Sequence, residues 1–191
     1  MEYKNLIKAH KKKVFKLDKA YNELILPIKD KNSWRNIDSI IDFVRRWNRR
    51  VPIEKNKEKI KKVILNLKNE FKSLEKYNIE NLEFNSRNIN KIRNIFNKFS
   101  KTVLKSTGTT KLMFGINPNL FVMWDKGICI KYGVYPNSAG YIIFMKIMQK
   151  EIKEVLKKHN KKDLIKETNR TLPKLIDEYN WINFRTSKMI K

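Results

Sequence analysis

Apolar residues recur at intervals of three and four along most of the chain, which is the spacing of amphipathic helices. Helices are predicted over residues 6–24, 37–47, 60–74 and 86–99. Asn85 or Ser86 is placed to cap the fourth of these, Ser138 to cap a later helix, and Pro173 to open another. Only Phe121–Trp124 has the short apolar character of a strand. The pattern therefore predicts an all-α protein of about seven or eight helices.

Glycine marks one unusual region in this helical pattern. All five glycines fall between Gly108 and Gly140, and the long flanks have none. No internal repeat is visible. We expect one all-helical domain over residues 1–191, with 1–100 and 101–191 as two candidate lobes.

The charge of the chain indicates the class of partner that the protein binds. Lys and Arg number 44 against 19 Asp and Glu, a net charge of +25, while hydrophobic residues make up 41% of the chain. Such a surplus on a chain able to bury a core indicates a folded protein that binds a polyanion, most simply DNA. No apolar run is long enough for a membrane span and no signal peptide is visible, so a cytoplasmic location is expected, on the nucleoid in a prokaryote.

Metal and cofactor chemistry have little support in the sequence. Cys129, His10 and His159 are the only Cys and His residues, too few for a zinc site, and a single cysteine excludes an internal disulfide. We expect no metal, no cofactor and no protein partner.

Arginines gather on and beside the second predicted helix, and their planar guanidinium groups suit phosphate oxygens. The cluster consists of Arg35, Arg45, Arg46, Arg49 and Arg50. One interpretation is a clamp on a nucleic-acid backbone, and the other is a solvated face paired with Asp38 and Asp42.

A cluster of small and hydroxyl residues precedes an apolar stretch in the glycine region. Gly108, Thr109 and Thr110 are predicted to form a turn that leads into a helix, with Lys111 at its start. Backbone N–H groups there would bind phosphate, and the positive end of the helix dipole would disfavour the charged form of Lys111. The alternative is an ordinary turn with a solvated lysine.

Asp125 follows a run of bulky apolar residues and precedes another helical stretch. It is expected to be semi-buried, either as a helix N-cap or as an acid, base or electrostatic stabiliser. Phe121, Trp124 and Tyr132 either line a base-binding pocket or belong to the core.

Residues 104–133 resemble the helix-hairpin-helix DNA glycosylase superfamily, in particular its 8-oxoguanine glycosylase-like branches. Gly108-Thr109-Thr110-Lys111 is similar to the hairpin and its lysine, and Phe121–Asp125 is similar to the approach to the essential aspartate. The resemblance implies a glycosylase-like fold. It also implies that Lys111 attacks the sugar to form a Schiff base, and that Asp125 stabilises the positive charge that develops on the sugar.

The sequence thus leaves a repair enzyme and a binding protein open. The first hypothesis is an N-glycosylase that removes an 8-oxoguanine-like base, with strand-cleaving (AP lyase) activity. The alternative is a non-catalytic basic helical protein whose central turn only grips phosphate. An RNA-binding factor has less support, because no aromatic-rich RNA motif is visible.

Overall fold

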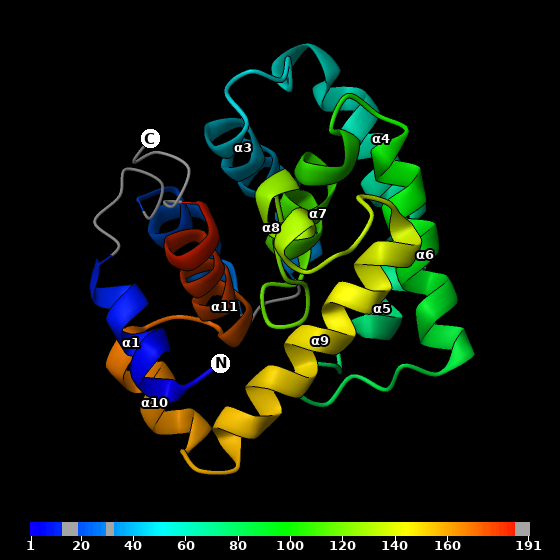
Figure 1. Ribbon diagram of the computed structural model, residues 1–191. Coiled ribbons are helices and arrows are strands. Elements are labelled where there is room, and N and C mark those ends of the chain that lie inside the picture. The colour runs from blue at the N-terminus through cyan, green and yellow to red at the C-terminus, as the bar shows by residue number, and fades with distance from the viewer. Residues whose placement is uncertain (13–18, 30–32, 186–191) are drawn as a thin grey trace.

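Helices form all the regular secondary structure of the part of the chain that the computed structural model describes, residues 1–12, 19–29 and 33–185 (Figure 1). The α-helices are α1 (Tyr3–Lys12), α3 (Ile37–Trp47), α4 (Lys57–Asn66), α5 (Lys68–Leu74), α6 (Ser86–Ser100), α7 (Lys105–Ile116), α8 (Lys126–Lys131), α9 (Ser138–Leu156), α10 (Lys161–Thr168) and α11 (Leu172–Asn180). Short 3₁₀ segments, η2 (Leu26–Ile28), η3 (Ser33–Arg35) and η4 (Glu54–Asn56), and π-helical turns, η1 (Tyr21–Ile25) and η5 (Trp181–Arg185), extend this pattern. The all-α prediction is confirmed.

The expected strand at Phe121–Trp124 is wrong. These residues are extended but pair with no neighbouring strand within the described ranges, and all of them are buried. Their apolar run therefore reflects burial on every side rather than a place in a sheet.

Side-chain caps explain most helix boundaries. The Asn85 side chain accepts a hydrogen bond from the Asn88 amide (2.9 Å), as expected for the start of α6. Asn137, and not Ser138, caps α9 by accepting from the Gly140 amide (2.9 Å). Thr171 caps α11 one residue before Leu172. The predicted helix over 60–74 is divided at Leu67 into α4 and α5, and residues 13–18 of the first predicted helix lie outside the described residues.

Helix α7 lies at the centre and packs against both α3 and α6, while α6 also packs against α9 (Figure 1). Helix α1 packs against α11, so the two ends of the described chain meet. Residue 100, the boundary between the two candidate lobes, falls at the end of α6, and the same connected core continues on both sides of it. Gly115 lets α7 approach α3, because a Cβ there would lie only 2.9 Å from Ile40 Cγ2.

A substitution at the start of α9 tests this close packing. Gly140→Ala should destabilise the protein by about 3 kcal/mol, because the new Cβ would lie 2.0 Å from the backbone carbonyl oxygen of Tyr135. Urea denaturation measures the change. Ala139→Ser, at the exposed neighbouring position, is the control and should change stability by less than about 0.5 kcal/mol. Equal stability of the two variants would contradict the packing at Gly140.

Candidate functional site

The amine of Lys111 lies against the C-terminal end of α3. Its Nζ donates to the Trp47 carbonyl oxygen and to Asn48 Oδ1, both at 3.1 Å, and lies 5.7 Å from the centroid of the Trp47 ring. The side chain is half-buried. The last carbonyls of a helix carry the negative end of its dipole, and the Lys111 amine lies at this end of α3. This corrects the prediction that Lys111 stands at the positive end of its own helix, since it lies midway along α7.

The expected turn at Gly108–Thr110 is wrong as well. Helix α7 begins at Lys105, so Gly108, Thr109 and Thr110 are buried inside it. Thr109 Oγ1 donates to the Lys105 carbonyl (2.5 Å), which satisfies the hydroxyl within the helix. The Gly108 amide is likewise bonded to the Leu104 carbonyl (3.1 Å) and is not presented to a phosphate. Small side chains are needed here because α7 is enclosed by its neighbours. A turn also requires small residues, so the sequence alone does not distinguish a turn from a crowded helix.

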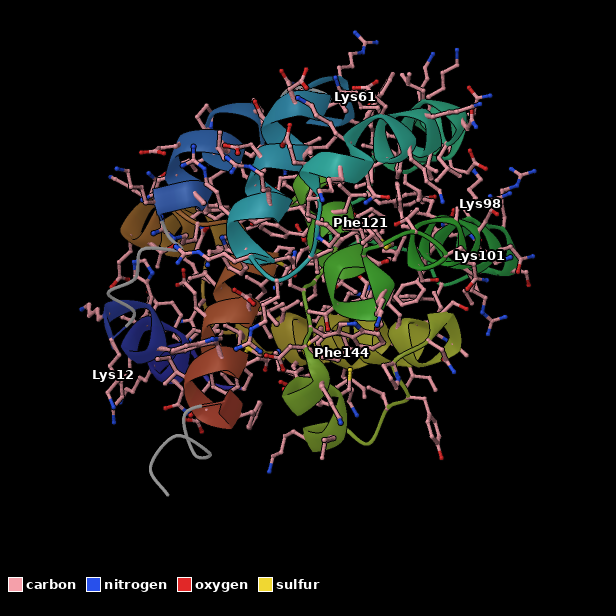
Figure 2. All side chains as sticks on the ribbon, turned by 90° about the horizontal axis from the view of Figure 1, so that it is seen from above. Lys12, Lys61, Lys98, Lys101, Phe121 and Phe144 are labelled. Carbon is pink, nitrogen blue, oxygen red and sulfur yellow. The ribbon has the colours of Figure 1, made fainter. Side chains whose placement is uncertain are left out.

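The connection between α6 and α7 lies a few residues before the predicted turn. Residues 101–104 join α6 to α7, two helices packed against each other. Lys98, Lys101 and Lys105 at this connection are exposed. Figure 2 shows Lys98 and Lys101 projecting outward from the helices. These exposed lysines form a basic part of the surface.

Asp125 is the N-cap of α8. Its Oδ1 accepts from the Ile128 amide at 3.0 Å and the residue is half-buried, as predicted. Burial, and after it the negative charge of Asp125, raise the pKa of the Cys129 thiol to about 12. The charge of Asp125 thus acts on the first turns of α8, and Cys129 is an inert thiol at neutral pH.

One hydroxyl joins the segments that carry Lys111 and Asp125. The Trp124 amide lies 3.3 Å from Thr110 Oγ1, and that hydroxyl lies 3.5 Å from the Trp124 carbonyl oxygen. Lys111 and Asp125 are the next residues on the two segments. The structure therefore brings their backbones together, while the Lys111 amine extends toward α3.

A buried ionic network, missed by the sequence reasoning, occupies α11. Glu178 is fully buried, and its carboxylate lies 2.8 Å from His10 Nδ1, 3.2 Å from Arg170 Nε and 3.3 Å from Lys174 Nζ. Lys174 is also fully buried and lies 3.4 Å from Asp177 Oδ2. In the sequence, Lys174 and Glu178 stand four residues apart in an otherwise apolar stretch after Pro173, and this spacing could have indicated the network.

Trp47 links this network to Lys111. Lys174 Nζ lies 5.0 Å from the centroid of the Trp47 ring, so ammonium groups from α7 and α11 both contact one indole. Lys174 and Arg170 also lie near the Tyr21 ring, at 5.6 and 5.2 Å. Burial raises the pKa of Tyr21 despite these cations. The amine site is thus the edge of a larger polar cluster.

The predicted arginine cluster divides into paired and unpaired members. Arg45 Nε and Arg46 Nε each donate to Asp42 at 2.9 Å, and Arg46 also donates to Glu23 (2.8 Å). By contrast, Arg49 and Arg50 are exposed and form no ion pair within the described part of the chain. They directly follow Asn48, a partner of Lys111.

Asp38 and Arg35, which also lie on or beside α3, have other partners. Asp38 pairs with Lys57 and Lys61 at 3.0 and 3.1 Å, and these hydrogen bonds lower the pKa of its carboxyl group. Arg35 lies over the Trp34 ring, 5.2 Å from its centroid, at the other end of α3. The paired-face interpretation therefore holds for Arg45 and Arg46, but with Asp42 and Glu23 as partners and without Asp38.

Two of the three predicted pocket aromatics are core residues. Phe121 and Trp124 are buried, and Trp124 packs against Tyr141 and Phe144 with ring centroids 5.1 and 5.5 Å away. In Figure 2, Phe121 and Phe144 lie in the interior among the helices. Tyr132 is half-buried, and its hydroxyl donates to Asn180 Oδ1 (2.9 Å). Trp124 thus does not line an open base pocket, which corrects the prediction.

A metal site and a membrane-spanning helix are both absent from the residues that the structure describes. No group of three or more Cys, His, Asp or Glu residues there is arranged to hold a metal ion, and no helix there is long and apolar enough to cross a membrane. Comparisons with models of protein families, with curated proteins and with solved structures match nothing.

The importance of the buried network can be tested at its shared carboxylate. Glu178→Gln should destabilise the protein by about 3 to 5 kcal/mol in urea denaturation, because it leaves buried cations without their counter-charge. Glu154→Gln removes an exposed partner of Lys157 and should leave the midpoint unchanged. Similar midpoints for both variants would show that the Glu178 contacts carry no net stability.

Proposed function

We propose that the protein is a DNA glycosylase with lyase activity, in which Lys111 is the nucleophile. The observation that carries this proposal is the place of the Lys111 amine. It is half-buried and held by Trp47 and Asn48, and the exposed Arg49 and Arg50 directly follow Asn48 in the chain. An amine at the edge of a basic surface is where the sugar of a bound nucleotide would meet it.

The chemistry assigned to the site follows from these groups. After losing its proton, the Lys111 amine forms a bond to C1′ as the bond between C1′ and the base breaks, and the bonding electrons leave with the base, which takes up a proton. Opening of the sugar ring gives a Schiff base, and loss of a proton from C2′ lets the 3′ phosphate leave and cuts the strand. Asp125 stabilises the positive charge on the sugar during the first step.

The basic surface supplies the grip on the strand. Arg49 and Arg50 follow Asn48, a partner of Lys111, while Lys101 lies on the α6–α7 connection and Lys105 begins α7. Lys111 lies six positions after Lys105, about 9 Å along α7. Phosphates bound at these places would position the intervening nucleotide at the amine.

A second candidate function is binding without chemistry. It is favoured by the cap that Asp125 makes on α8, which gives this carboxylate a structural role. In that case the basic surface grips DNA or RNA phosphates and Lys111 only ties α7 to α3.

Borohydride trapping separates the two functions. Wild-type protein is incubated with duplexes that carry 8-oxoguanine, uracil or an abasic site, and a covalent complex with DNA is expected. Lys111→Ala should abolish trapping while binding of the duplex is retained, because one cation adds little to a protein of net charge +25. Asp125→Asn should lower base release by orders of magnitude. It should change thermal stability little, because asparagine also caps helices.

Two results would contradict the enzyme. One is the absence of trapping or base release by the wild type on all three duplexes. The other is normal excision by Asp125→Asn or by Lys111→Ala. Either result, together with tight salt-dependent binding, supports the protein that binds without chemistry.

The salt dependence of binding tests the surface independently. Arg49→Ala combined with Arg50→Ala should reduce the slope of log affinity against log salt by about 0.9 for each phosphate that the variant no longer binds. The matched control is Lys153→Ala with Lys157→Ala, an equal change of charge in the C-terminal half of α9, which lies across the molecule from α3 (Figure 1). A slope that falls equally in both variants would place the clamp elsewhere.

A further inference from the structure

A cavity of about 250 Å³ lies at the other end of α3 from Lys111. It is enclosed by η3, which precedes α3, by α5, and by residues 116–121 at the end of α7 and beyond it. Trp34 lines the cavity, whereas Trp47, the contact of Lys111, is the last residue of α3. An 11-residue helix is about 16 Å long, so the cavity and the Lys111 amine are separate sites.

One aromatic side chain at the cavity, Trp34, can accept the face of a flat ring. Phe71, Leu74 and Phe121 line the cavity and are buried. Trp34 also lines it, with its Nε1 donating to the Glu75 carboxylate and the Arg35 guanidinium 5.2 Å from the ring centroid. These contacts hold the indole in place. An indole held in this way can stack on a heterocyclic base.

The asparagine side chains at the cavity edge differ in how many hydrogen bonds they make within the protein. Asn117 donates to the Leu74 carbonyl (3.5 Å) and accepts from the Asn119 amide (3.2 Å). Asn119 Nδ2 donates to the Lys29 carbonyl (3.0 Å). Asn78 is bonded through its backbone to Asn81 Oδ1, but its side-chain amide makes no hydrogen bond to another described residue. Asn78 therefore offers one donor and one acceptor side by side.

We propose that this cavity binds an adenine base, stacked on Trp34 and held at its edge by Asn78. An asparagine amide matches adenine in a bidentate manner, since it accepts from N6 and donates to N7. The base can belong to a free nucleoside or to an unpaired position in a strand. This site is independent of the chemistry proposed for Lys111.

Titration with adenosine tests the proposal. The probe is followed by calorimetry and by the indole N–H resonance of Trp34, assigned with Trp34→Phe. Adenosine should bind and shift that resonance, whereas ribose, which has no ring to stack on the indole, should do neither.

Matched variants locate the contact. Asn78→Asp keeps the size of the side chain but removes its donor, so adenosine affinity should fall about tenfold. Asn69→Asp makes the same change at an exposed position of α5 outside the cavity and should leave affinity unchanged. Lys111→Ala should also leave it unchanged, so a failure of the glycosylase assignment and a failure of this site are distinguishable.

The source of the base follows from a competition. A single strand that contains unpaired adenine and displaces adenosine from wild-type protein, with the same loss in Asn78→Asp, indicates a base in a strand. A strand that fails to displace adenosine indicates a free nucleoside. The proposal is overturned if millimolar adenosine neither shifts the Trp34 resonance nor gives heat, if ribose shifts the resonance equally, or if Asn78→Asp and Asn69→Asp behave alike.

Discussion

The buried carboxylate of Glu178 is the constraint around which much of the molecule is arranged. An ion without water is tolerated in a protein only when opposite charges surround it. Its partners come from three places in the chain, His10 on α1, Arg170 just before α11, and Lys174 on α11. Satisfying this one group therefore requires both ends of the described chain to meet, and the packing of α1 on α11 follows.

Trp47 connects the buried ionic network to the surface of the protein. Lys174 contacts one indole from the interior network, and Lys111 contacts the same indole from α7. The next residues of the chain reach the exposed Arg49 and Arg50. A continuous path thus runs from the most buried charges to the basic surface, with the half-buried amine between them.

The sequence predicted the helical class and several boundaries, because periodicity and caps are local. Asn85 and the Pro173 region act as expected, and the half-burial of Asp125 follows from the apolar run before it. It did not predict that Gly108–Thr110 lie inside α7, since small residues serve a turn and a crowded helix equally well. Nor did it predict the partner of Lys111 or the Glu178 network, because these depend on helices that meet only in the folded molecule. The paired and exposed arginines could not be separated for the same reason.

The meeting of α1 with α11 has a consequence for how the protein is made. A chain emerging from the ribosome presents α3 and α7 well before α11, and Trp47 then lacks Lys174 beside it. His10 is synthesised early, whereas its partner Glu178 lies 168 positions later in the chain. Such distant pairing delays completion of the core. The indole beside Lys111 thus gains its contact with Lys174 only after α11 has been synthesised.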